Sequence, residues 1–501
     1  MTSITGRIEN LIGMTMDTCR PWITSEDGSV LFKDPVDGCE ISAHYGASHM
    51  AASLIILGKL KDDHSMISEG ESLLGSLLDR WDYMKSLPGF HNDFNNFALC
   101  IIDGLSDRSH DRIKDTVLKT DDTSFNTVNW LPMRWYVNRK RLEWTGEERY
   151  GKICEDIRSM LDEAVFPDGF IDDMLPKGRS FSLQYDVAST AFMQFLRVSG
   201  EQIDISSQTG ALLNALCPDG DINYMGRGTN QVFCWGLWIY LLSSAGLNDE
   251  LDRALSYLEG YLPVMLMNNN IMLNSNAGKE KYMWWDYHYC SVYTAHLLMW
   301  LVLALCDYGK KPVVPSYIPE GNSGLHIYRN DDSFVALFDG RSEYLAEKGP
   351  VISAVWTKES GTVFKGSFGP WYGLFGNRYI RPDASRKNFM GMMRENDGII
   401  AAASSLIRKI SRPGRKDTSG GFDPVFYRPQ IDITDGIKIT YRTDRHPAVL
   451  NIPVFKGSVL ITVDGSEVKA QDTVTIRNQY GQATVTEMLI APRKTVEIRI
   501  T

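Results

Sequence analysis

Two stretches of similar design, PDGFIDDMLPKGRSFSLQYD (residues 167–186) and PDGDINYMGRGTNQVF (residues 218–233), decide the fold of the first part of the chain. Their Pro-Asp-Gly turns lie 51 residues apart, and each is followed by a polar, aromatic helix start. A pair of helices with its two turns has about that length, so the repeat predicts stacked helical hairpins. When such hairpins close into a ring they form an (α/α) toroid, whose inner helices begin around one cleft.

Helical spacing of apolar residues extends well beyond these two stretches. From about residue 5 to residue 310, apolar side chains recur every three or four positions, as at Leu73, Leu74 and Leu77. Short polar turns separate the segments, and the pattern predicts roughly ten to twelve helices. We therefore expect an N-terminal (α/α) toroid over residues 1–312.

The pattern changes after about residue 314. Short runs rich in β-branched residues follow, at residues 334–338, 437–441, 459–463 and 495–500. Three prolines interrupt both patterns between Lys310 and Pro319, and Asp464-Gly465 is a tight-turn signal. The sequence therefore predicts a C-terminal antiparallel β-sandwich over residues 313–501.

The composition limits the classes of protein. A chain of 501 residues with 43% apolar residues predicts two or three domains with large cores. Its net charge of -10 disfavours a nucleic acid or an anionic membrane as partner. It begins without an apolar signal core and has no run of about 18 apolar residues, so we expect a cytoplasmic protein. The eight cysteines include no CxxC pair, which favours reduced, buried thiols.

An aromatic segment precedes the last apolar helix of the first part. Residues 284–293, WWDYHYCSVY, combine Trp and Tyr side chains with an aspartate and a histidine. Each of these rings carries a polar tip that needs a partner when it is buried. Flat apolar faces beside hydrogen-bonding tips suit sugar rings. The alternative is an aromatic helix start whose polar atoms bond to backbone carbonyls.

A glycine-flanked arginine, Arg227, lies in the second of the two repeated stretches. Gly226 and Gly228 let the backbone bend, and the amides of Asn230 and Gln231 follow at a helix start. Arginine is suited to bidentate recognition of a carboxylate. The loop matches neither of the common glycine-rich phosphate motifs. A solvated arginine in a surface loop is the alternative.

A helical toroid followed by a β-sandwich, with aromatic inner helix starts, resembles the toroid-type polysaccharide lyases, in particular the heparinase II/III-like group and its alginate-lyase relatives. In that family an Asn or His on one inner helix and a Tyr on a later one flank a uronic acid. Asn129 and Tyr185 are 56 residues apart, which is similar to the family spacing, and both fall at predicted inner helix starts.

The resemblance implies a lyase that removes the C5 proton of a uronic acid and expels the oxygen at C4. Asn129 would then bond the carboxylate, with Arg227 or Arg134 adding positive charge. Tyr185 would be the base, and a phenol needs a nearby cation to ionise at working pH, for which Arg179 and Arg227 are candidates. His288 is a candidate second acid or base. No cofactor is implied.

The predicted glycan contacts are the other polar or aromatic residues near helix starts: Asn96, Arg134, Gln184, Tyr224, Asn230, Gln231, Trp235, Trp284, Trp285 and Tyr287. Each candidate also has a structural alternative. Tyr185 can be a buried tyrosine bonded to a carbonyl, and Asn96 or Asn129 can cap a helix. His288 can be a core histidine tied to Asp286. The aromatic loop 368–373 would lie over the sugar or pack on its own domain.

The chain also departs from the family. Many relatives carry a histidine motif early in the β-domain, but residues 338–347 contain no histidine. His326 and His446 look like strand or turn residues, and His44 and His49 lie outside the HExxH spacing, so we expect them to be structural. The sequence therefore predicts no metal site.

Two other functions stay open. A glycoside hydrolase on the same toroid needs two carboxylates that flank the bond. The candidates are Asp93, Asp168, Asp172, Asp173, Asp186 and Asp286. A non-catalytic glycan-binding protein is the second alternative. The sequence does not decide the uronic acid, the linkage or the oligomeric state.

Overall fold

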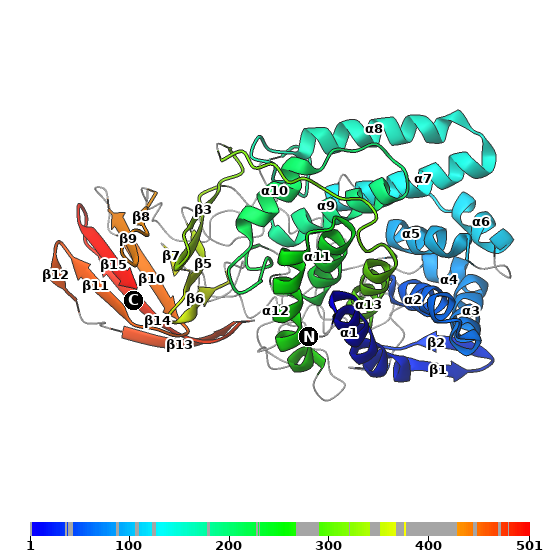
Figure 1. The fold of residues 1–501 in the computed structure, drawn as a ribbon, viewed down its shortest axis with the longest axis horizontal. Helices are drawn as coiled ribbons and strands as arrows, with labels where there is room; N and C mark the ends of the chain where they lie inside the picture. Colours follow the sequence, from blue (N-terminus) through cyan, green and yellow to red (C-terminus); the bar gives the residue numbers. More distant parts are fainter. Residues whose placement is uncertain are drawn as a thin grey trace.

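The computed structural model describes residues 3–500 except 36–37, 39–43, 87–89, 106–109, 123–126, 178–180, 227–228, 230, 267–289, 320, 341–350, 367–374, 377–427, 444–447, 469–471 and 479. Helices fill one end of the molecule and antiparallel sheets fill the other (Figure 1). The helical end is built from the N-terminal part of the chain, as the apolar spacing predicts.

An inner ring of helices forms the centre of the helical part. Among the described residues six helices belong to it: α2 (Gly46–Lys61), α5 (Asn92–Asp103), α7 (Leu131–Thr145), α9 (Leu183–Val198), α11 (Val232–Ser244) and α13 (Cys290–Cys306). Each packs against the next along the chain, and α13 packs against α2, which closes the ring. All residues of α11 are buried, because neighbours surround it on every side.

An outer layer of amphipathic helices covers this ring. It consists of α1 (Ile4–Cys19), α3 (His64–Asp79), α6 (His110–Lys119), α8 (Glu148–Ala164), α10 (Ser206–Ala215) and α12 (Asn248–Leu266). Most of these outer helices bury one apolar stripe; in α8, for example, Cys154, Ile157 and Leu161 are buried. Alternation of inner and outer helices around a closed ring is the (α/α) toroid. Short pieces connect them: α4 (Trp81–Ser86), η1 (Arg20–Trp22) and η2 (Val128–Trp130).

A β-hairpin interrupts the helical part, against the prediction of helices throughout. Strands β1 (Ile23–Glu26) and β2 (Ser29–Phe32) pair antiparallel around Asp27-Gly28. Both turn residues have positive φ, 49° and 79°, which is the conformation of the tight hairpin turn that an Asp-Gly pair favours. The sequence therefore contained the signal, although the surrounding helical spacing concealed it.

Two antiparallel sheets form the C-terminal part within the described residues. The larger sheet has the order β13-β14-β10-β7-β5-β4-β3, with β6 beside β5, and the smaller has the order β12-β11-β15-β9-β8. The strands are β3 (Leu325–Arg329), β4 (Ser333–Phe338), β5 (Val351–Thr357), β6 (Gly361–Lys365), β7 (Phe375–Gly376), β8 (Gln430–Asp432), β9 (Ile437–Arg442), β10 (Ala448–Val454), β11 (Val459–Val463), β12 (Ser466–Glu467), β13 (Asp472–Asn478), β14 (Gly481–Ile490) and β15 (Thr495–Ile500).

Strand β4 of the larger sheet is buried on both faces. Along β4, Phe334 and Phe338 belong to the core shared with the helices, whereas Val335 and Leu337 belong to a core shared with the smaller sheet. Successive side chains of a strand point to opposite faces, so β4 needs apolar residues at every position. One face of this sheet therefore docks on the toroid. The β-sandwich and the boundary at residues 312 and 313 stay predictions.

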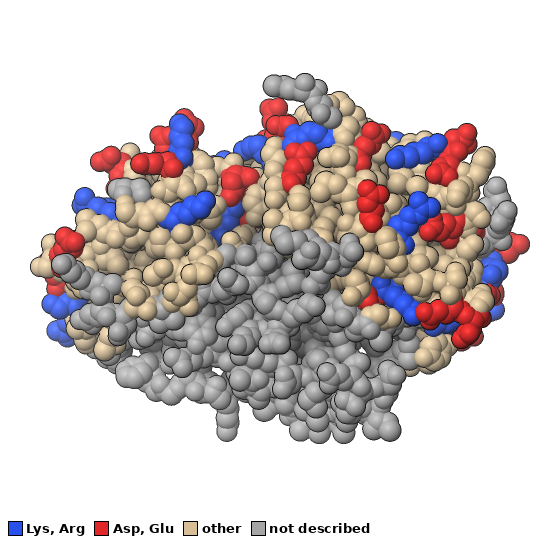
Figure 2. Space-filling model, turned by 90° about the horizontal axis from the view of Figure 1, so that it is seen from below, with Lys and Arg blue, Asp and Glu red and all other residues tan. Residues whose placement is uncertain are grey.

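Surface charge and cysteines agree with the composition. Figure 2 shows acidic and basic side chains interspersed over the described part of one face. Seven described cysteines are free thiols, and six of them are buried. Among the described helices, none is long and apolar enough to cross a bilayer.

Candidate functional site

The first turns of the inner helices, with the residues just before them, meet at one end of the ring; we call this end the mouth. Outer helices return the chain between inner ones, so the inner helices run in one direction. Ring contacts join four of their starts. Tyr45, before α2, stacks on Phe94 of α5 at 4.2 Å, and Phe233 of α11 contacts Tyr293 of α13 edge-to-face at 6.2 Å between ring centroids.

Partly exposed rings lie above this packed layer. His44 stacks on His91 at 4.6 Å, and His91 lies 5.4 Å from Trp130 between ring centroids. All three are partly exposed, whereas Tyr45 and Phe94 behind them are buried. A row of half-exposed rings presents apolar faces bordered by polar atoms, which is a surface that a sugar ring can contact.

Two tyrosines belong to opposite sides of the ring, Tyr45 before α2 and Tyr185 on α9. Burial, with a smaller contribution from nearby Tyr185, raises the pKa of Tyr45 well above its usual value. Tyr45 therefore stays a neutral hydrogen-bond donor. Tyr185 lies on the first turn of α9 and is 8% exposed. Tyr185, which contributes to the pKa shift of Tyr45, was predicted from the sequence as a site residue. Tyr45 was not predicted.

Asn129 is held by an aspartate. It lies in η2, the turn that packs against both α7 and α9, and it is 2% exposed. Its Nδ2 atom donates to Oδ1 of Asp173, and the backbone N–H of Val128 donates to the Asp173 carbonyl over 2.7 Å. Asn129 is thus neither a helix cap nor an isolated amide. Asp173 fixes the plane of its carboxamide and uses one of its two N–H donors.

Arg134 is paired with Asp93 across α5 and α7. Nε and Nη2 of Arg134 lie 3.0 and 3.3 Å from the two carboxylate oxygens of Asp93. Asp93 is buried and the Arg134 side chain is 11% exposed. The pair neutralises part of the charge on Arg134. The contact is bidentate, which fixes the orientation of the guanidinium relative to α5.

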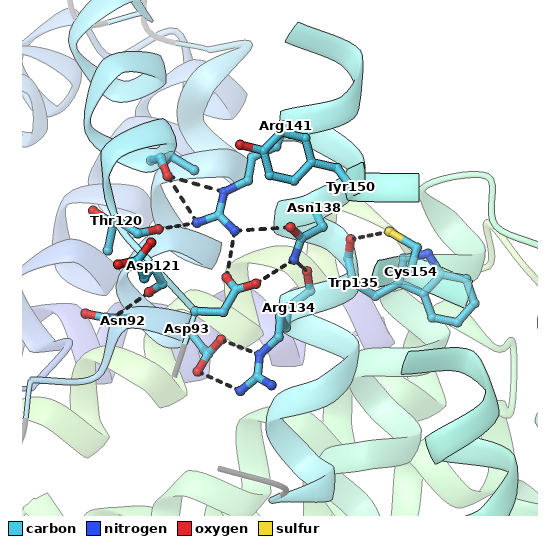
Figure 3. A network of polar contacts seen from close by, with 12 residues as sticks. Asn92, Asp93, Thr120, Asp121, Arg134, Trp135, Asn138, Arg141, Tyr150 and Cys154 are labelled. Atoms are coloured by element: carbon cyan, nitrogen blue, oxygen red, sulfur yellow. Dashed lines mark hydrogen bonds and ion pairs between the residues drawn. The ribbon is translucent and has the colours of Figure 1, made fainter. Parts of the chain in front are cut away.

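A buried polar network supports this pair (Figure 3). Arg141, one helical turn further along α7 than Asn138, donates to Asp122 over 2.7 Å and to the Val117 and Thr120 carbonyls. Asn138 donates to Asp122 over 2.9 Å and to the Arg134 carbonyl over 2.9 Å. The network ties the chain after α6 to α7. It therefore fixes the helix turn that carries Arg134.

Other predicted contacts lie deeper than expected. Asn96, one of the predicted glycan contacts, is inside α5 and buried. The Tyr224 hydroxyl donates to the Ala215 carbonyl over 2.7 Å, and Trp235 stacks on Tyr257 at 4.7 Å, both without exposed surface. Gln184 is also fully buried, and Gln231 nearly so. We do not carry Asn96, Tyr224 or Trp235 into the proposed site, because all three are buried.

Several predictions fall outside the described residues. They are Arg179, Arg227, Asn230, Trp284, Trp285, Asp286, Tyr287, His288, His446 and the loop 368–373. Their roles stay predictions.

The described aspartates of the hydrolase alternative are all buried. Asp93 pairs with Arg134, Asp173 holds Asn129, and Asp168 accepts from Ser323 Oγ over 2.6 Å. Asp186 accepts from the Ile171 N–H over 3.0 Å, and burial raises its pKa well above the usual range.

Buried histidines lie beneath the mouth. His49 Nδ1 lies 2.9 Å from the Tyr45 carbonyl, which makes Nδ1 the protonated nitrogen. Its ring centroid is 5.2 Å from that of His296. Burial lowers the pKa of His49 to about 3 and that of His296 well below its usual value, so both are neutral. Among the described residues no group of three or more His, Cys, Asp or Glu side chains is arranged to hold a metal.

The sequence analysis missed Tyr45, His91, Trp130 and the role of Asp173. Trp130 directly follows Asn129, and His91 lies five residues before Asn96, so aromatic neighbours of these two candidate amides were the available signal. Tyr45 has no comparable signal.

A cavity of about 590 Å³ lies away from the mouth, along the second half of α7; it is lined by Tyr136, Arg139, Lys140, Leu142, Glu143, Ser199 and Glu201.

No protein-family model matches this chain, and no curated protein matches it. Solved structures resemble it over 60% of its length. An inactive alpha-1,6-mannanase variant from Salegentibacter sp. HEL1_6, in complex with alpha-1,6-mannotriose, is 13% identical, is covered over 99% of its chain and has a TM-score of 0.42. A polysaccharide lyase is 10% identical, with 97% covered and a TM-score of 0.41. A family 88 glycosyl hydrolase from Bacteroides vulgatus is 12% identical, with 98% covered and a TM-score of 0.40. Similarity of this degree carries no conclusion about the ligand or reaction of this chain.

Proposed function

We propose that the chain is a glycan-cleaving enzyme that breaks a glycosidic bond beside a uronic acid by β-elimination. The fold would be a toroid followed by a β-sandwich, with the reaction at the mouth. The observation that carries the proposal is the position of Tyr185: it lies on the first turn of α9, and this helix packs against the turn that holds Asn129. The half-exposed rings of His91 and Trp130 support it, because they offer faces to a sugar.

The proposed chemistry assigns each group a step. The Tyr185 phenolate takes the C5 proton, the C5–H electrons form a C4–C5 double bond, and the C4–O bond breaks. The departing oxygen then receives the proton from the Tyr185 phenol. Negative charge develops on the uronate during proton removal, so donors directed at it lower the barrier. Asn129 has one N–H beyond its bond to Asp173, and Arg134 adds positive charge beside it. Neutral Tyr45 is a further donor.

The test is a screen of uronate-containing oligosaccharides for the ultraviolet absorbance of the new double bond. We expect Tyr185→Phe to lower kcat at least 100-fold, the range of general acid–base catalysis, while glycan binding persists. Tyr308→Phe is the matched control, because that hydroxyl donates to Asn248 over 2.7 Å, beyond the C-terminal end of α13. Full activity of Tyr185→Phe would overturn the assignment. Binding without turnover by the natural chain would indicate a non-catalytic glycan-binding protein.

Hydrolysis is the second candidate, because carboxylates adjoin both donors of the site. Asp173 holds Asn129 and Asp93 holds Arg134, so either could exchange its donor for a substrate hydroxyl or water. A hydrolase releases reducing ends without the new absorbance. In that case Asp173→Asn or Asp93→Asn would abolish turnover, whereas Tyr185→Phe would retain it.

A further inference from the structure

A buried lysine of the larger sheet reaches into the toroid. Lys365, the last residue of β6, is 1% exposed. Its Nζ atom lies 2.8 and 2.6 Å from the two carboxylate oxygens of Asp219 and 3.1 Å from Asp221. Burial alone would lower the pKa of Lys365, but the charges of these two aspartates outweigh it and raise the pKa above the usual value. The lysine is therefore a permanent cation inside the interface.

Further contacts from the same sheet surround this ion pair. Thr362 Oγ1 donates to Asp219 over 2.8 Å. The Tyr480 hydroxyl, from the turn between β13 and β14, donates to the Asn223 carbonyl over 2.6 Å. The hairpin that carries Tyr480 extends from the sheets toward α12 in Figure 1. Strand β6 and the turn between β13 and β14 thus both bind one short segment of the toroid, residues 219–223.

The residues that follow this segment, 225 and 226, contact the start of α9. The Leu183 N–H donates to the Met225 carbonyl over 3.2 Å. Gly226 has φ +92°, and a Cβ atom there would lie 2.7 Å from the Ser182 side chain. Residues 225–226 therefore support Ser182 and Leu183, which immediately precede Gln184 and Tyr185 on the first turn of α9.

We propose that Lys365 is a positioning residue for the mouth: it fixes residues 219–226, and these residues fix the first turn of α9 with Tyr185. The expected effect of Lys365 on activity rests on the proposed function, whereas its effect on the position of the first turn of α9 does not. The sheet region is then part of the catalytic apparatus, although it supplies no group that touches the reacting atoms.

Hydrogen–deuterium exchange on the full chain tests the proposal without a substrate. We expect Lys365→Met to raise amide exchange at least 10-fold in peptides covering residues 181–186 and 219–226. Tyr480→Phe, which keeps the ion pair, should raise exchange in the same two peptides to a smaller extent. Lys358→Met is the control, because Lys358 forms an exposed ion pair with Asp332 and should leave both peptides unchanged.

Unchanged exchange at residues 181–186 in a folded Lys365→Met or Tyr480→Phe variant would overturn the proposal. If Lys365→Met does not fold, Tyr480→Phe alone decides. Activity gives a separate readout: we expect kcat to fall at least 10-fold with KM changed less than threefold, because Tyr185 is displaced while the rest of the mouth remains. If no uronate glycan is cleaved by the natural chain, the proposed function fails and the exchange result still stands.

Discussion

The two Pro-Asp-Gly turns have the same backbone but different chemistry. In both, the glycine N–H donates over 2.9 Å to the carbonyl three residues earlier, of Phe166 or Cys217. Gly169 and Gly220 have φ of +90° and +96°, and each approaches a carbonyl of the next outer helix. Each turn also directs its aspartate at the sheet region, so the repeat that defines the toroid also provides its two attachment points.

The partners of the two aspartates differ in charge. Asp168 accepts from the Ser323 hydroxyl over 2.6 Å and from its N–H over 3.3 Å, whereas Asp219 binds the buried Lys365. The segments after the turns also differ: one leads to Asp173, which holds Asn129, and the other leads to Met225, which holds Leu183. A repeat in sequence thus predicts a shared backbone, while the energy of each attachment depends on residues far away in the chain.

The largest expected difference between the turns is the effect of replacing each aspartate by asparagine. Asp219→Asn should lower the free energy of unfolding by about 3 kcal/mol, because a buried lysine loses its main counter-charge. Asp168→Asn should cost only about 1 kcal/mol, because the amide oxygen still accepts from Ser323. Urea unfolding of the two variants measures both values. Equal costs would mean that charge does not distinguish the two attachments.

The toroid was predictable because its signals are local. Apolar spacing gave the helices, and the repeat gave their pairing; α9 begins at Leu183 and α11 at Val232, close to the predicted starts. The start of α5 was harder to predict, because Asn96 was a candidate helix cap but lies inside the helix. Its amides suggested a cap, but Asn95 instead donates to the His44 and His91 carbonyls and accepts from Ser48, so the helix begins at Asn92.

The contacts of Asp168 and Asp219 with the sheet region could not be predicted, because the partner residues lie far away in the sequence. Lys365 lies 146 residues beyond Asp219, and nothing near it in the sequence marks a buried cation. The candidate site was predictable only in part for the same reason. Asn129 and Tyr185 carried a spacing signal, whereas Tyr45 and Asp173 gain their roles from contacts between helices that the ring closure brings together.

The shared backbone predicts equal effects for the two glycines. A Cβ atom at Gly169 would lie 2.3 Å from the Ser207 carbonyl oxygen, and one at Gly220 would lie 2.5 Å from that of Arg253. Gly169→Ala and Gly220→Ala should each cost about 2 kcal/mol more than Gly200→Ala, which has positive φ but open space around it. Thermal unfolding of the three variants measures this. A glycine variant as mild as Gly200→Ala would show that its turn can move away from the neighbouring helix.

The charged attachment should also depend on pH. Although burial opposes it, Lys365 lowers the pKa of Asp219 below its usual value. The contribution of Asp219 is therefore complete above about pH 4, its value in the unfolded chain, and is lost as the pH falls through the lower folded value. The cost of Asp219→Asn should thus shrink in acid. If the cost of Asp219→Asn in unfolding free energy grew below about pH 4, the predicted direction of the pH dependence would be wrong.

The smallest expected effects come from the hydroxyl donors, where the two turns should be alike. Thr362 Oγ1 donates to Asp219 over 2.8 Å, and Ser323 Oγ donates to Asp168 over 2.6 Å. Thr362→Val and Ser323→Ala should each cost about 1 kcal/mol, the net value of one hydrogen bond to a partly satisfied carboxylate. Both costs can be read from urea unfolding. In the Asp219→Asn background, Thr362→Val should cost less than it does alone, because its acceptor no longer carries a charge. If the two changes were additive, the hydroxyl would act independently of the charge on Asp219, and the contrast between the turns would come from the lysine alone.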